Sequence, residues 1–349
     1  MDTLRDSAGA REGEHAYLHR LRVLAAFAVV IIHTASKDFT VPATTTADWQ
    51  FLSMYEGLSH WAVPVFVMIS GALFLDPKRE LPLKKLFGKY ILRILLALIF
   101  WSAFYAVAYA GIYLRGSLRE VWDYFLQGHV HLWYLPMLIG LYLTAPVLRP
   151  MVRETKTGWY LVALAAFFAV LVPTLAQIPG TGPLRGQFDR LALHLPLGYT
   201  GYFAAGSMLH RTQQKKSVRY TLYALGALAT VAAIAVSGIG SARAGEIRTW
   251  LYNYFSPCVA LQSAAIFVLL RQIGGRPLPR PLRLLSGCSF GIYLIHELFI
   301  DFLRRFCGLG PLSLPTVLSV PLIAALVFAL SAAVTALLRQ IPLARRTIV

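Results

Sequence analysis

Arg22 and His33 are two ionisable residues inside an otherwise apolar stretch of the chain. They are eleven residues apart, about 1100° of rotation in an α-helix, so both side chains would share one face, roughly 16 Å apart along the axis. An ionisable group at the centre of a membrane helix costs on the order of 2.5–3.5 kcal/mol, which makes it a candidate functional residue. A neutral imidazole can take a proton from a hydroxyl group. His33 is therefore a candidate general base, and Arg22 a candidate anchor for an anionic group.

Both residues also have purely structural interpretations. His33 could be satisfied by a neighbouring helix, and Arg22 could extend to the lipid headgroups and anchor the helix. Their shared face favours the functional interpretation.

A second apolar segment begins at His60 and contains Pro64, Ser70 and Gly71. Pro64 lacks an amide donor and would open or kink a helix, and small residues allow two helices to approach closely. We expect His60 at the outer membrane interface, and helix packing could also explain the whole segment.

His129 and His131 precede Trp133 and Tyr134 in a third segment. Two residues that are two positions apart do not share a helix face, and no carboxylate lies nearby in the sequence. We expect a contact with the substrate or an interfacial cluster rather than a metal site. The cysteines do not change this, since their spacing fits neither a disulfide framework nor a metal site; they are Cys258, Cys288 and Cys307.

His296 and Glu297 are adjacent polar residues in a late apolar run, and Asp301 follows one turn beyond Glu297. They could line a cavity, or they could form a polar network that joins packed helices.

Four basic residues lead into the third apolar run: Lys84, Lys85, Lys89 and Arg93. Such a cluster sets topology and attracts anionic lipid headgroups. It could also bind the phosphates of a cytosolic donor.

The composition predicts an all-α polytopic membrane protein. The chain is 57% hydrophobic and only 14% charged, against about 25% charged residues in soluble proteins, and its mean hydropathy is +0.59. Apolar runs long enough to cross a bilayer follow one another. We count ten candidate spans, at roughly 18–36, 60–75, 91–113, 133–148, 159–175, 195–209, 220–236, 252–270, 286–303 and 315–338.

The formal net charge is +17, and the distribution of the basic residues along the chain indicates the membrane topology. If the N-terminus is cytoplasmic, 24 of the 33 Lys and Arg residues fall in cytoplasmic segments, as the positive-inside rule requires. Both termini are then cytoplasmic. We expect a cytoplasmic segment over 1–17, a transmembrane domain over 18–340 and a cytoplasmic tail over 341–349. No basic stripe with interleaved aromatic residues indicates nucleic-acid binding.

The order of these motifs, over roughly residues 17–340, resembles the acyltransferase-3 family of integral-membrane O-acyltransferases. Arg22 and His33, with ten residues between them, are the most specific element. The supporting elements are Val63-Pro64-Val65-Phe66 through Ser70-Gly71, His131-Leu132-Trp133-Tyr134-Leu135 and Ser289-Phe290-Gly291-Ile292-Tyr293-Leu294-Ile295-His296. The subgroup resembled modifies cell-surface glycans and includes enterobacterial common antigen acetyltransferases.

The resemblance implies a multi-pass enzyme of the bacterial cytoplasmic (inner) membrane. Its donor would be cytosolic acetyl-CoA, and its acceptor a sugar hydroxyl on a cell-surface or lipid-linked glycan. His33 would be catalytic, and Arg22 would bind the donor together with Lys85, Lys89 and Arg93. The expected substrate contacts are His60, His131, Trp133, Tyr134, His296 and Glu297, of which Glu297 departs from the family pattern. The competing interpretations are a transporter or flippase and a membrane sensing module.

Overall fold

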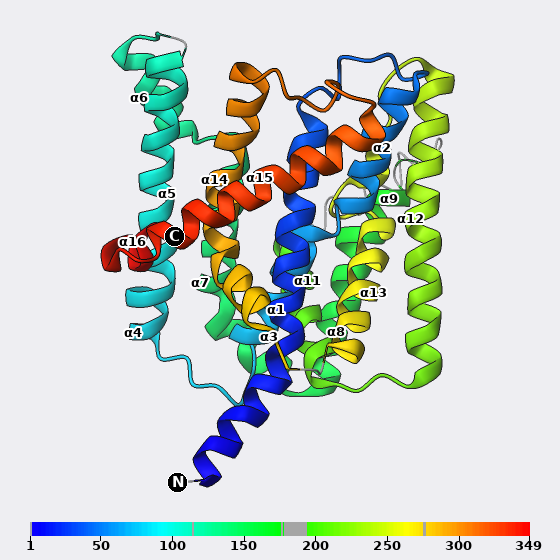
Figure 1. Cartoon of the computed structure of the whole chain (residues 1–349). Coiled ribbons are helices and arrows are strands. Elements are labelled where there is room, and N and C mark those ends of the chain that lie inside the picture. Colours follow the sequence, from blue (N-terminus) through cyan, green and yellow to red (C-terminus); the bar gives the residue numbers. More distant parts are fainter. Residues whose placement is uncertain (1, 114, 176, 178–193, 275–276) are drawn as a thin grey trace.

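The computed structural model describes residues 2–113, 115–175, 177, 194–274 and 277–349, with the side chains of 2–14, 194 and 195 left out. Every regular element in these ranges is a helix (Figure 1). Arg185, Arg190 and Arg276, which entered the charge count, lie outside the described residues.

The α-helices are α1 (Asp2–Ser36), α2 (Ala47–Ser59), α3 (Ala62–Phe74), α4 (Leu83–Lys85), α5 (Leu92–Tyr105), α6 (Leu118–Gln127), α7 (Tyr134–Arg153), α8 (Thr155–Ala165), α9 (Val172–Leu175), α11 (His194–Arg211), α12 (Lys216–Ala244), α13 (Pro257–Ile273), α14 (Arg280–Phe306), α15 (Thr316–Leu338) and α16 (Pro342–Thr347). Wider π-helical turns extend several of them: η1 (Leu86–Ile91), η2 (Ala106–Tyr113) and η4 (Ala166–Leu171). Two short 3₁₀ helices complete the set, η3 (Val130–Trp133) and η5 (Trp250–Tyr252).

The predicted all-α polytopic membrane architecture is confirmed. Within the described part of the chain, nine helical segments are long and apolar enough to cross a membrane. The remaining expected span, near 195–209, coincides with α11.

The second span begins earlier than predicted, at Ala47 rather than near residue 60. It is made of α2 and α3, which are separated by a break at His60 and Trp61. We predicted a loop here because α2 contains two acidic residues, Asp48 and Glu56. His60 thus lies in the middle of the segment, so its predicted place at the outer interface is wrong.

The N-terminal end of α1 and the basic α4 lie at the same end of the molecule, and α6 lies at the opposite end (Figure 1). This arrangement agrees with the charge asymmetry that predicts a cytoplasmic N-terminus. The last residues pack against α5, where Arg93 donates a hydrogen bond to the Val349 main-chain oxygen (2.6 Å) and Trp101 donates to Ile348 (2.9 Å).

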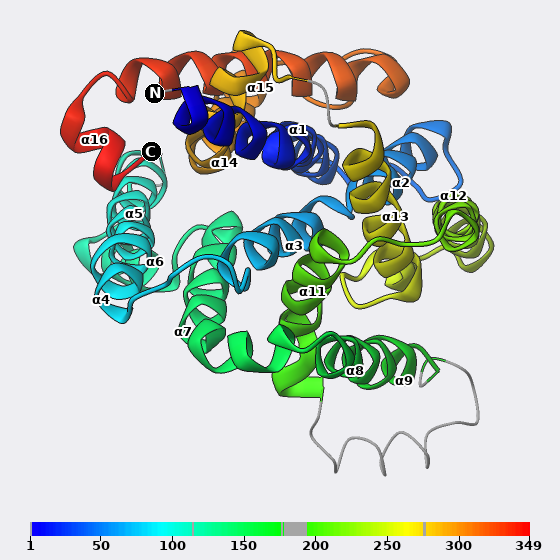
Figure 2. The ribbon, with the colours of Figure 1, turned by 90° about the horizontal axis from the view of Figure 1, so that it is seen from below.

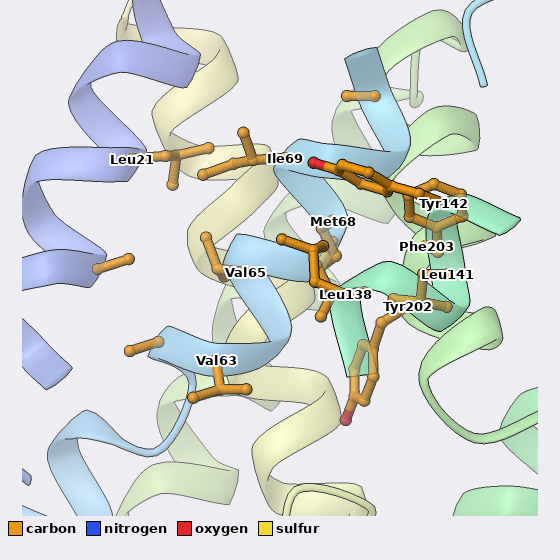
Figure 3. Packing of buried hydrophobic residues seen from close by; sticks show 14 of the residues in the cluster. Leu21, Val63, Val65, Met68, Ile69, Leu138, Leu141, Tyr142, Tyr202 and Phe203 are labelled. Carbon is orange, nitrogen blue, oxygen red and sulfur yellow. The ribbon is translucent and has the colours of Figure 1, made fainter. Parts of the chain in front are cut away.

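The core includes the packing of α3 against α11 (Figure 3). A Cβ at Gly71 would overlap the main-chain oxygen of Phe203, and one at Gly206 would overlap that of Met68. The two backbones therefore touch, as small residues permit in membrane helices. This contact fixes α3, which carries one wall of the site. Seen from below, α1, α3, α5, α7 and α14 surround the centre of the molecule (Figure 2).

Candidate functional site

A cavity of about 450 Å³ lies between α1, α3, α5, α7 and α14. Arg22 and His33 both line it, so the helix face that their spacing predicts is the face that α1 turns toward the cavity.

One part of the cavity wall is strongly cationic. Its basic lining residues are Arg22, Arg79, Lys85, Arg93, Arg149 and Arg339. Among the described lining residues, Glu80 is the only carboxylate to oppose them. Six cations around one small volume suit a ligand with several negative charges, because like charges repel one another when no anion is bound.

The cations are held in different ways. Arg149 donates hydrogen bonds to the main-chain oxygens of Phe74 (2.7 Å) and Arg79, so α7 is tied to the end of α3. Arg93 stacks over the Phe290 ring at 5.4 Å. Arg22 makes no hydrogen bond or ion pair with any residue that the structure describes, and its guanidinium remains available to a ligand.

His33 is part of a charged network between α1 and α14. Its Nδ1 lies 2.7 Å from Glu297 Oε1, and Glu297 Oε2 lies 2.7 Å from Lys37 Nζ. Lys37 Nζ is also 3.0 Å from Asp301 Oδ1. The pairs follow from helical spacing, since each helix contributes two residues that are four positions apart.

The network determines which nitrogen of His33 is free to react. A carboxylate can only accept a hydrogen bond, so Glu297 holds the proton on Nδ1 and leaves the Nε2 lone pair exposed. Burial opposes the charge of Lys37, but the fields of Glu297 and Asp301 outweigh it and raise the Lys37 pKa. Lys37 therefore stays protonated at neutral pH and balances the buried carboxylates.

Three more imidazoles surround His33. The His296 ring centroid is 4.9 Å from that of His33, and the His131 centroid is 6.3 Å away. His129 Nδ1 and His131 Nδ1 are 2.8 Å apart, although we expected their side chains not to meet. They meet because His129 precedes η3 in an extended conformation. The Nε2 atoms of His131 and His296 are buried without a hydrogen-bond partner among the described residues.

Two groups in this cluster have the residue types of a metal site. His33, His296 and Glu297 bring one ligand atom each within 4.8 Å of one another, and so do His129, Glu297 and Asp301. Both groups depend on Glu297, whose two oxygens are already paired with His33 and Lys37. The Lys37 ammonium supplies the positive charge that these carboxylates need. That no metal binds here stays a prediction.

The wall beyond His33 is aromatic. Trp133 and Tyr254 line the cavity there, with centroids 5.8 Å apart and planes inclined by 29°. Tyr199 packs on Trp133 at 5.9 Å, and His60 packs on Tyr254 at 5.6 Å.

The structure gathers most of the predicted site residues around this one cavity. Those that line it are Arg22, His33, Lys85, Arg93, His131, Trp133 and Tyr134. His60, Lys89, His296 and Glu297 are not among its lining residues. Glu297 and His296 instead contact His33 from the side, and Lys89 is exposed.

Sequence reasoning missed five residues of the site. Arg79, Arg149 and Arg339 counted only as topology signals, because their convergence depends on how the helix ends pack. Lys37 stood four residues after His33, and its helical spacing was the available signal. Tyr254 lies in the connection between η5 and α13 and had no signal.

A family model described as an acyltransferase domain, that of acyltransferase-3, matches residues 15–337. The chain belongs to the acyltransferase-3 family. Comparison with curated proteins and with solved structures gives no match. This acyltransferase-3 chain is thus a multi-pass membrane acyltransferase.

Proposed function

We propose that the protein is an O-acetyltransferase of the bacterial inner membrane. It would move an acetyl group from cytosolic acetyl-CoA to a sugar hydroxyl of a cell-surface or lipid-linked glycan. One observation carries the proposal: a single cavity is lined both by a cluster of cations and by His33.

The cationic wall suits the phosphates of coenzyme A. Arg22 offers an unpaired guanidinium, and Lys85 and Arg93 line the same cavity and add positive charge. The pantetheine arm is long and thin, so it can extend along α1 across the roughly 16 Å that separates Arg22 from His33. The thioester would then lie beside the imidazole.

The acyl transfer needs one general base, and overall it neither consumes nor releases a proton. His33 Nε2 takes the hydroxyl proton of the sugar while the sugar oxygen attacks the thioester carbonyl carbon. The carbon–sulfur bond breaks, and the departing thiolate takes the proton back from His33. Glu297 stabilises the imidazolium that exists between these steps, as a carboxylate does in other His-based acyl-transfer sites.

A second route has the same reactants and products. His33 Nε2 attacks the thioester carbon, the carbon–sulfur bond breaks, and coenzyme A leaves as a thiolate that takes a proton from water. The acceptor hydroxyl then attacks the acetyl group and loses its proton to water, and the bond between the acetyl group and Nε2 breaks. In this route donor and acceptor bind in turn, which gives ping-pong kinetics.

Mass spectrometry of surface glycans tests the proposal in the cell. A deletion strain should lose one acetyl mass increment, and the wild-type gene should restore it. His33→Ala protein, present at the wild-type level in the membrane, should not restore it. Unchanged glycans in the deletion strain would contradict the proposed function.

A further inference from the structure

A series of rings in contact with one another borders the cavity next to the histidine cluster. Tyr254 lies between two neighbours, with Trp133 at 5.8 Å and His60 at 5.6 Å. Tyr199 extends the series beyond Trp133. Trp133 is 38% exposed and lines the cavity, so part of its surface is available to a ligand.

An ionisable pair inside the second span supports this series. Glu56 is only 6% exposed. His60 Nδ1 lies 2.7 Å from the Glu56 main-chain oxygen and 3.3 Å from its carboxylate Oε2. Glu56 Oε1 has no hydrogen-bond partner among the described residues. A buried carboxyl and imidazole are costly in a membrane, and such groups are expected to serve a function. The break between α2 and α3 brings His60 against Tyr254.

These rings suit a sugar better than an anion or a lipid chain. A pyranose has apolar C–H faces that pack on aromatic planes, and polar edges that need hydrogen-bond partners. The cation–ring contacts of the described residues involve neither Trp133 nor Tyr254. A lipid chain has no polar groups, so its binding would not explain why Glu56 and His60 are buried beside these rings.

We propose that a pyranose ring of the acceptor packs against Trp133 and Tyr254, and that Glu56 acts through His60 to position Tyr254. Trp133 follows His131 in η3, and the His131 ring centroid is 6.3 Å from that of His33. A sugar on this surface would present an edge hydroxyl toward His33. The inference rests on the proposed function, since it takes a sugar as the acceptor.

Saturation-transfer NMR tests this subsite without relying on catalysis. The full chain carrying His33→Ala is placed in lipid nanodiscs and mixed with methyl α-D-glucopyranoside, or with mannitol as an open-chain polyol. We expect saturation on the ring C–H protons of the glycoside and about tenfold less on mannitol, which has no ring face. Equal signals from the two compounds would overturn the proposal.

Substitutions locate the binding surface. Trp133→Ala or Tyr254→Ala, added to His33→Ala, should lower the glycoside signal about tenfold. Trp133→Phe and Tyr254→Phe keep an aromatic ring and should retain the signal. Trp122→Ala and Tyr160→Ala are matched controls, because both side chains are exposed and neither lines the cavity. An unchanged signal in both alanine variants would refute the subsite, and acetyl-CoA binding by the same samples shows that they are folded.

The positioning role of Glu56 has its own readout in the active enzyme. Glu56→Gln should raise the KM for the glycoside several-fold and leave the KM for acetyl-CoA unchanged. A purely structural role would lower the amount of active protein and move neither KM. If the wild-type protein transfers acetyl groups but Glu56→Gln leaves the KM for the glycoside unchanged, the positioning role fails while the proposed function stands.

Discussion

Glu297 is a buried carboxylate that two basic side chains share. Its oxygens lie 2.7 Å from His33 Nδ1 and 2.7 Å from Lys37 Nζ. A buried charge is costly unless it is paired, and removal of one partner leaves the other as an uncompensated buried charge. The arrangement gives His33 a fixed orientation, which a general base needs.

Glu297→Gln tests this arrangement. The amide keeps the shape but can donate to Nδ1, which allows the wrong tautomer of His33. We expect kcat to fall by about 10² or more, with little change in the KM for acetyl-CoA. Steady-state kinetics of purified protein measure both. A wild-type kcat in Glu297→Gln would exclude Glu297 from the mechanism.

Arg22→Ala tests the donor site. Loss of one charged hydrogen bond of about 1.5–3 kcal/mol should raise the apparent KM for acetyl-CoA roughly 10- to 100-fold. Lys89→Ala is the matched control, since Lys89 belongs to the same basic cluster but does not line the cavity. If the two variants have equal acetyl-CoA affinities, Arg22 has no special role.

Helical periodicity predicted that Arg22 and His33 share one face, because both residues belong to one helix. It could not predict that Glu297 meets Lys37, because that contact joins segments far apart in the sequence and depends on how α1 packs against α14. Sequence reasoning left open whether Glu297 lines a cavity or joins helices. Its contacts support the second alternative, and its role stays a prediction.

At the scale of elements, the contact between α3 and α11 holds the cavity wall in place. Gly71 and Gly206 each lie against the opposing backbone. Ser70 and Gly71 indicated a close helix approach in the sequence, but the partner helix could not be inferred from them. The position of α2 was also hidden, because its acidic residues mask its membrane-spanning nature.

Gly71→Ala should destabilise the protein. The new Cβ would force α3 and α11 apart, and such overpacking typically costs about 1–3 kcal/mol. A lower midpoint of thermal unfolding in detergent reports this. Gly140→Ala is the control, because a Cβ at Gly140 meets nothing within 4 Å. Equal midpoints for the two variants would show that the helices do not touch there.

At the scale of the whole molecule, the fold places the basic α4 and the N-terminal end of α1 at one end of the bundle (Figure 1). Cytosolic acetyl-CoA can enter the cationic part of the cavity only if this end is cytoplasmic. The composition and the apolar runs predicted the all-helical membrane fold well, because they depend on the lipid environment rather than on particular contacts.

Single cysteines in a cysteine-free background test the orientation. In intact cells, a membrane-impermeant thiol reagent should label Leu118→Cys and leave Lys84→Cys unlabelled until the membrane is permeabilised. Both positions are exposed, so accessibility within the protein is matched. The opposite labelling pattern would reverse the topology and exclude entry of acetyl-CoA from the cytoplasm.

The central claim is that His33 moves an acetyl group from a thioester to a hydroxyl. The most direct measurement uses purified protein in lipid nanodiscs with radiolabelled acetyl-CoA and a glycan acceptor. Wild-type protein should release one free coenzyme A for each acetyl group on the acceptor, and His33→Ala at the same concentration should lose about 10²-fold or more of this activity. Undiminished transfer by His33→Ala would contradict the claim, as would wild-type protein that never cleaves the thioester, the result expected of a transporter or a sensing module.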